Sequence, residues 1–137
     1  MANEIMLERL EQLEKNIFEL EKFKSDLSIE DIKDNIRLQW SLRYGLFESV
    51  QIVIDLSCHL SSYYNLGNPK TYSDCVELLV EHNYLSKTLG EKLIGMIGLR
   101  NILIHEYVKI EMERLYSLLN NLEDFKAFVS EIREIIK

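Results

Sequence analysis

One stretch of the chain, residues 97–110, reads IGLRNILIHEYVKI and decides the fold that the sequence predicts. Its apolar residues surround a helix on nearly every side, whereas a surface helix has a single apolar stripe. A helix of this kind is buried by more than one neighbour, and a second copy of the chain is a natural cover for the face next to the polar residues. The stretch therefore predicts an inner helix of a helical bundle.

The same stretch carries a guanidinium, an amide, an imidazole and a phenol, the side chains of Arg100, Asn101, His105 and Tyr107. Arginine is an always-charged planar fork that suits a phosphate, and histidine titrates near neutral pH and can move a proton. These residue types point to phosphodiester chemistry. On one ideal helix, however, Arg100 and His105 diverge by about 140° and by about 7.5 Å along the axis. If two such helices pack around a twofold axis, each cleft combines groups from both chains. The plainer alternative is a structural hydrogen-bonded pair of Arg100 and His105 at a helix end.

The rest of the chain is helical in pattern, with one proline and five glycines as punctuation. Ser28, Thr71 and Ser86 are placed as N-caps, and the sequence shows no strand alternation. Helices are expected from about Ile5 to Lys24, and over residues 29–62 with a bend near Gly45, 71–81, 86–107 and 111–137. The predicted fold class is all-α, a bundle of about five helices in a single domain, residues 1–137.

Length and composition are those of an ordinary globular domain. The 137 residues suffice for one core, and 47% of them are hydrophobic and 28% charged. The N-terminus is acidic where a signal peptide would be basic, and no apolar run approaches the roughly 20 residues of a membrane span. We therefore expect a cytoplasmic protein without a membrane partner. Cys58 and Cys75 lack C-x-x-C spacing and a ligand cluster, so two reduced thiols, no disulfide, no metal and no cofactor are expected.

The net charge of −7 argues against binding of nucleic acid by bulk electrostatics, because such binding neutralises many phosphates with Lys and Arg. Any contact with RNA must then be local. The charge is compatible with a nuclease only if Arg100 and neighbours such as Arg37 or Arg43 cluster beside a cleft.

The spacing of Arg100, His105 and Tyr107 resembles the signature of the HEPN superfamily, in particular its HepT-like toxin branch. The resemblance extends over roughly the whole chain, since three further segments follow in the order of that branch: Ile54-Asp55-Leu56, Asn68-Pro69-Lys70-Thr71-Tyr72 and Met96-Ile97-Gly98-Leu99-Arg100-Asn101. The resemblance implies an up-and-down helical bundle, a homodimer and a metal-independent endoribonuclease. It also implies a toxin neutralised by a minimal nucleotidyltransferase antitoxin, which adenylylates Tyr107.

In this interpretation His105 is the general base or acid for attack by a ribose 2′-hydroxyl, and Arg100 stabilises charge on the phosphate. Asn101 orients His105 or donates to the phosphate. Asp55 lies in an apolar run, so it either holds Arg100 or His105 in place or has a purely structural partner. For Tyr107 the alternative is a tyrosine packed at a helix end with its hydroxyl in water.

The remaining candidates are weaker. His59 and His82 have no companion at ligand spacing and are interpreted as surface or capping residues. Tyr63, Tyr64 and Tyr72 surround Pro69 and either stack on bases or, as we favour, pack within the loop. The alternative function, from a different class, is a noncatalytic interaction or nucleotide-binding module that docks a nucleotidyltransferase.

Overall fold

The structure is a computed structural model that describes residues 2–105 and 111–136. Its elements are α1 (Ala2–Asp26), α2 (Ile29–Lys33), α3 (Ile36–Tyr63), α4 (Tyr72–Glu81), α5 (Lys87–His105), α6 (Met112–Ser117), the 3-10 helix η1 (Leu118–Asn121) and α7 (Leu122–Arg133). No strand occurs among the described residues. The predicted all-α fold is confirmed.

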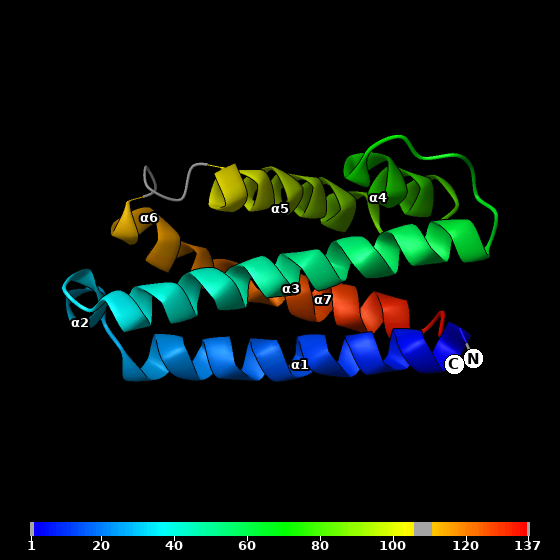
Figure 1. The fold of residues 1–137 in the computed structure, drawn as a ribbon. Helices are drawn as coiled ribbons and strands as arrows, with labels where there is room; N and C mark the ends of the chain where they lie inside the picture. Colours follow the sequence, from blue (N-terminus) through cyan, green and yellow to red (C-terminus); the bar gives the residue numbers. More distant parts are fainter. Residues whose placement is uncertain (1, 106–110, 137) are drawn as a thin grey trace.

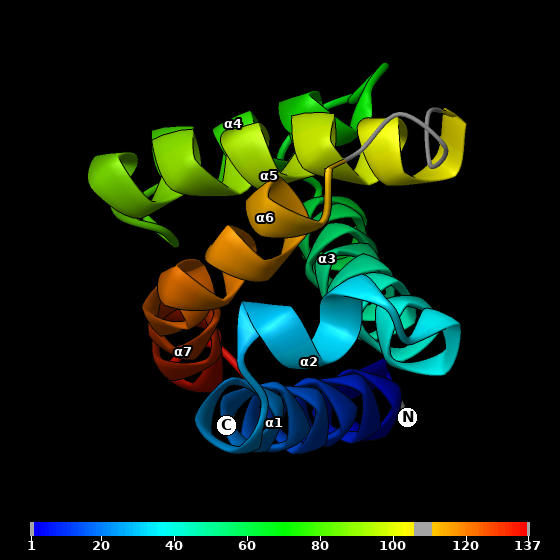
Figure 2. The same ribbon diagram turned by 90° about the vertical axis from the view of Figure 1, so that its left-hand side faces the viewer.

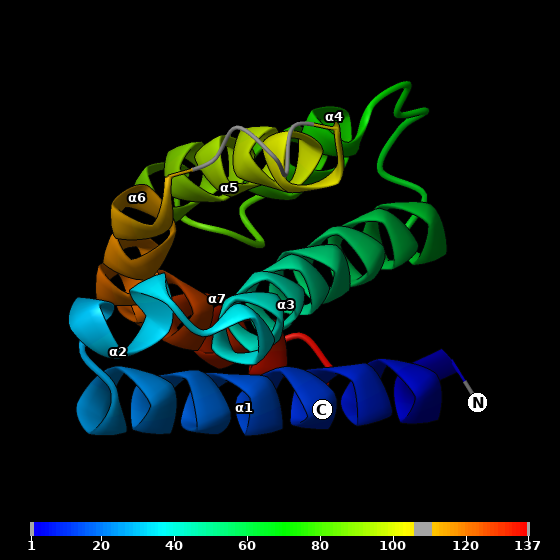
Figure 3. The same cartoon turned by 60° about the vertical axis from the view of Figure 1, so that its left-hand side comes forward.

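The long helices alternate in direction along the bundle, as Figure 1 shows. α1, α3 and α7 pack together around the main core, and α4 and α5 lie on the side of α3 away from α1 (Figure 2). α3 crosses α1 at an oblique angle (Figure 3), and it contacts α1 and α7 on one side and α4 and α5 on the other. Its fully buried residues include Leu42, Leu46, Val53 and Leu60. α3 is therefore the central helix, against which the motif on α5 is placed.

Two of the five predicted helices are interrupted in the structure. The helix expected over residues 29–62 is broken before Asn35, and it continues through Gly45. The side chain of Asn35 accepts from the backbone N–H of Leu38, and the Gln39 amide donates to the carbonyls of Ile32 and Lys33. These side chains satisfy backbone groups that a helix end exposes, so the break costs little.

Gly45 does not bend α3, and its role is in packing. A Cβ built there would lie 3.1 Å from the Leu20 side chain, so the glycine allows α1 to approach α3 closely.

The helix expected from residue 111 onward consists of α6, η1 and α7. Near the end of α6 the Ser117 hydroxyl donates to the carbonyl of Arg114 at 2.6 Å, which competes with helical bonding. Asn120 and Asn121 follow, and asparagine is a poor helix former. The predicted N-caps at Ser28, Thr71 and Ser86 are confirmed.

Candidate functional site

Arg100 lies near the C-terminal end of α5, half-buried between α3 and the start of α4. Its Nε donates to Oε1 of Gln51 at 3.1 Å, and its Nη1 donates to Oδ1 of Asn101 at 3.1 Å. Its guanidinium carbon lies 5.9 Å from the ring centre of Phe47 and 5.2 Å from that of Tyr72. Two aromatic rings and two amides therefore fix the guanidinium, and its Nη2 has no acceptor among the described residues.

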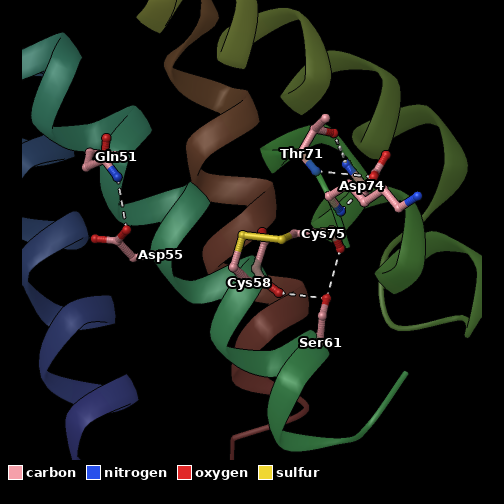
Figure 4. The surroundings of a disulfide bond; sticks show 9 residues. Gln51, Asp55, Cys58, Ser61, Thr71, Asp74 and Cys75 are labelled. Carbon is pink, nitrogen blue, oxygen red and sulfur yellow. Dashed lines mark hydrogen bonds between the residues drawn. A yellow bond between two sulfur atoms is a disulfide. The ribbon is translucent and has the colours of Figure 1, made fainter. Parts of the chain in front are cut away.

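Gln51 connects Arg100 to the predicted supporting residue Asp55. The Gln51 amide donates to Oδ1 of Asp55 at 2.9 Å, as Figure 4 shows, and Oδ2 of that carboxylate pairs with Arg9 of α1 at 3.1 Å. An ionised carboxylate only accepts hydrogen bonds, so Asp55 holds the amide nitrogen of Gln51 and turns its oxygen toward Arg100. Asp55 thus acts on Arg100 through Gln51 and not by the direct contact that the sequence suggested.

Gln51 is a site residue that the sequence analysis missed. A signal for it exists, because Gln51 and Asp55 are four residues apart and therefore neighbours on one helix face. Its contact with Arg100 depends on how α3 packs against α5.

Arg100 has no carboxylate partner among the described residues. Asp55 is paired with Arg9, and the neutral amide of Gln51 lies between that carboxylate and Arg100. The positive charge of Arg100 is consequently positioned but not neutralised, which is the condition that an anion site requires.

The sequence analysis expected Arg37 or Arg43 to lie beside Arg100, and the two differ in position. Arg43 lines a pocket of about 380 Å³ together with Phe47, whose ring also faces Arg100. The buried Nε of Arg43 has no hydrogen-bond partner. Arg37 is exposed near the start of α3, about 15 Å along the helix axis from Phe47. Of the two arginines expected beside Arg100, only Arg43 thus shares a neighbour with it, the ring of Phe47.

His105 is the last residue of α5 and is exposed. None of the described residues bonds to its ring, and both hydrogen bonds of Arg100 go elsewhere. A structural Arg100–His105 pair is therefore not formed between these side chains. Asn101 contacts Arg100 and not His105. Tyr107 lies outside the described residues.

Cys58 and Cys75 form a disulfide between α3 and α4, so the prediction of two reduced thiols is wrong (Figure 4). The cysteines are 17 residues apart, yet α3 and α4 pack side by side and bring the two Cα atoms to 4.8 Å. This separation is within the range that a disulfide bridges. Sequence spacing fails here because the pairing depends on tertiary packing.

The other residues considered from the sequence have ordinary surroundings. His82 is the C-cap of α4, with Nδ1 at 3.0 Å from the Leu78 carbonyl, and exposed His59 stacks on Tyr63. Among the described residues no group of three or more His, Cys, Asp or Glu side chains could hold a metal. None of the helices described is long and apolar enough to cross a membrane.

Comparison with known proteins gives one consistent family. The model of the family "Ribonuclease HepT-like" matches residues 13–132. The chain belongs to the HepT-like ribonuclease family. It is 27% identical over 132 residues to the mRNA nuclease HepT of Shewanella oneidensis, a match that covers 96% of this chain and 98% of that protein. It is 25% identical to the tRNA nuclease HepT of Aphanizomenon flos-aquae, over 93% and 87% of the two chains.

Solved structures agree with this placement. The tri-AMPylated HEPN toxin of Shewanella oneidensis, in complex with MNT antitoxin, superposes with a TM-score of 0.85 at 27% identity, over 95% of this chain and 97% of that one. The predicted HepT-like family is confirmed for this chain.

Proposed function

We propose that this HepT-like chain is a metal-independent endoribonuclease and the toxin of a toxin–antitoxin pair. The observation that carries the proposal is the state of Arg100, whose guanidinium is held by Gln51, Asn101 and two aromatic rings while no described carboxylate neutralises it. Preorganised donors of this kind stabilise the charge that develops on a phosphate during transfer. RNA is the substrate class, in keeping with the nuclease relatives.

His105 supplies the proton transfer. Its neutral ring accepts the proton of a ribose 2′-hydroxyl while the 2′-oxygen bonds to the adjacent phosphorus and the bond from phosphorus to the 5′-oxygen breaks. The leaving 5′-oxygen takes a proton from the imidazolium of a second His105, contributed by another copy of the chain. The products are a 2′,3′-cyclic phosphate and a 5′-hydroxyl. Arg100 holds the phosphate oxygens, and Asn101 and Asp55 position Arg100, the latter through Gln51.

A homodimer supplies that second copy. Ile36, Trp40 and Tyr44 follow one another by a helical turn on α3 and are each about 60% exposed. Next to them Leu103 and Ile104 of α5 line the same 380 Å³ pocket as Trp40. A second copy of the chain that packs on this apolar face buries it. The same packing brings the C-terminal ends of the two α5 helices, which carry Arg100 and His105, close together.

The test of the dimer uses two aromatic residues of equal exposure. Trp40 and Phe18 are both 61% exposed, on α3 and α1 respectively. Trp40→Glu is expected to yield monomers by light scattering and to lose RNA cleavage, while Phe18→Glu remains dimeric. A wild-type monomer that cleaves RNA contradicts the dimer.

The antitoxin partner is a nucleotidyltransferase that adenylylates Tyr107, two residues after the last residue of α5. The proposal is supported by the solved relative, which is tri-AMPylated and in complex with MNT antitoxin. An adenylyl group on Tyr107 adds a phosphodiester whose negative charge competes with RNA for Arg100. We place the pair in the cytoplasm, where RNA and nucleotides are available.

The experiment that tests the function is induction of the chain in cells, with growth and total RNA followed. The wild type is expected to arrest growth and cut RNA, and His105→Ala and Arg100→Ala to lose both effects by at least about 100-fold. The controls are His59→Ala and Arg133→Ala, which change the same residue types away from the site. If well-folded wild type and both site variants are equally harmless, catalysis is excluded. The noncatalytic docking module then becomes the better account.

A further inference from the structure

A pocket of about 620 Å³ lies directly beside Arg100. It is formed between the disulfide of α3 and α4, the segment from Pro69 to Ser73, and Ile97 and Asn101 of α5. Pockets for small molecules commonly measure about 300–1,000 Å³ and combine apolar walls with a few polar groups. This pocket is of that size and has that composition.

Two residues belong both to the pocket and to the surroundings of Arg100. Asn101 lines the pocket, and its Oδ1 accepts from Nη1 of Arg100. Tyr72 lines it too, and its ring centre lies 5.2 Å from the guanidinium carbon. A phosphate held by Arg100 therefore lies next to the pocket. The nucleoside attached directly to that phosphate is the part of an RNA that is near enough to enter the pocket.

Two polar groups of the pocket are free to donate hydrogen bonds to a ligand. Since Oδ1 of Asn101 is occupied by Arg100, this amide offers its N–H groups, for which no described residue is an acceptor. The ammonium group of Lys70 makes no ion pair with the described residues. Donors of this kind suit the carbonyl oxygens and ring nitrogens of a nucleobase.

Tyr72 differs from the other tyrosines near Pro69. Tyr64 stacks on Tyr84 with ring centres 5.2 Å apart, and Tyr63 packs edge-on against Tyr64. The rings of Tyr63 and Tyr64 are therefore engaged in packing, and Tyr84, which follows α4, takes part in it. Tyr72 is 44% exposed and lies at the pocket, so its ring can stack on a base.

The rim of the pocket is fixed before any ligand binds. The carboxylate of Asp74 accepts from the backbone N–H groups of Lys70 and Thr71, and the Ser61 hydroxyl donates to the carbonyl of Cys75 (Figure 4). The disulfide ties the same turn of α4 to α3. Preorganisation lowers the entropic cost of ligand binding.

We propose that this pocket binds the nucleoside attached to the phosphate that Arg100 holds, an inference that rests on the proposed ribonuclease function. Tyr72 stacks on the base, Asn101 and Lys70 donate to its acceptor atoms, and Ile97 with the disulfide forms the apolar wall. The pocket then determines which base is accepted at one position beside the cut.

The first experiment measures kcat and KM on an RNA of mixed sequence and sequences the 5′ ends of the products. Tyr72→Ala is expected to raise KM about tenfold, because it removes a base–aromatic stacking contact, and to flatten the base preference at one position. Tyr72→Phe keeps the ring and both properties. Lys70→Ala shifts the same preference by a smaller amount. The matched controls Tyr63→Ala and Lys87→Ala leave both quantities within twofold.

Tyr72 also touches Arg100, so a second reading of the same data is needed. A loss transmitted through Arg100 lowers cleavage equally at all sequences, because phosphate contacts carry no base information. A uniform loss, or an unchanged base distribution in Tyr72→Ala, overturns the pocket while the ribonuclease function stands.

A binding measurement separates the pocket from catalysis. A 2′-deoxy oligonucleotide cannot undergo the proposed attack, so its affinity is measured for the wild type and for Tyr72→Ala. If the wild type binds the oligonucleotide more tightly than Tyr72→Ala but cleaves no RNA, the ribonuclease function is refuted and the nucleoside pocket is retained. Equal, weak binding by both proteins refutes the pocket.

Discussion

In the seam between α1 and α7, Arg133 pairs with Glu14 and Lys126 pairs with Glu21. At the other side of the bundle Arg100 contacts amides and rings only, although Asp55 is close enough to bind the same glutamine. Both regions contain exposed or half-exposed cations in a chain with net charge −7. Overall charge is therefore a poor guide to the charge at a particular site. The carboxylates neutralise cations elsewhere and leave Arg100 free for an anion.

The largest effect is expected when Arg100 is given a carboxylate partner, as the cations in the seam between α1 and α7 have. Gln51→Glu replaces the amide oxygen that accepts from Nε of Arg100 at 3.1 Å by a carboxylate oxygen, and it removes the N–H that Gln51 donates to Asp55, so the new carboxylate turns from Asp55 toward Arg100. A charge-assisted hydrogen bond contributes about 1.5–3 kcal/mol, so kcat/KM for RNA is expected to fall by about 10- to 100-fold. The control is Gln12→Glu, the same substitution at an exposed position of α1. Equal activity of Gln51→Glu and wild type contradicts the role of an unneutralised Arg100.

The region around the pocket is held by the disulfide between α3 and α4, whereas the seam between α1 and α7 is held by ion pairs. Replacing both Cys58 and Cys75 by serine is expected to lower the free energy of unfolding by about 3 kcal/mol, the usual contribution for a loop near this length. Urea unfolding with and without a dithiol reductant measures it. The reductant should destabilise the wild type and leave the double variant unchanged. A wild type indifferent to the reductant shows that the bond does not stabilise this half.

The ion pairs of the seam are expected to contribute less. Arg133 and Glu14 are each nearly half-exposed, and exposed pairs commonly stabilise by about 0–1 kcal/mol. Arg133→Ala should therefore lower the free energy of unfolding by less than about 1 kcal/mol and leave RNA cleavage unchanged. Loss of cleavage in a stable Arg133→Ala protein removes the distinction between the two regions.

The smallest effect concerns the rim of the pocket at low pH. The backbone N–H of Lys70, followed by contacts with Thr71, holds the pKa of Asp74 below its ordinary value of about 3.9. A carboxyl group with a lowered pKa stabilises the fold above its unfolded pKa, and this contribution is lost as the pH falls through the folded pKa. The difference in Tm between wild type and Asp74→Asn should be constant above about pH 5 and shrink below about pH 4. A difference that is independent of pH contradicts the contact.

Local signals in the sequence predict much of the fold. Ser28 and Thr71 each start a helix with an aspartate three residues later, and both capping boxes are present. The break at Asn35 is harder to predict, because the capping chemistry of Asn35 and Gln39 competes with an apolar pattern that continues through it. Gly45 suggests a bend in the sequence, because the sequence alone does not show that the side chain of Leu20 packs against this glycine.

The site is predicted less completely, because its contacts join distant segments. The residue types and spacing of Arg100 and His105 predict the chemistry that we propose for the end of α5. The contact between Gln51 and Arg100 spans 49 residues and depends on how α3 and α5 pack. The disulfide of Cys58 and Cys75 likewise depends on the pairing of α3 with α4. No spacing rule along the chain contains this information.

The role of Arg100 as the phosphate site is best tested by measuring RNA affinity in a variant that cannot cleave RNA. His105→Ala provides this background, and Arg100→Ala or Arg133→Ala is added to it. Removal of Arg100 is expected to weaken binding of a short RNA by at least about tenfold, as a lost charge-assisted contact predicts. Removal of the seam-paired Arg133 should change it by less than about twofold. If both substitutions weaken binding equally, or neither does, Arg100 is not the phosphate site.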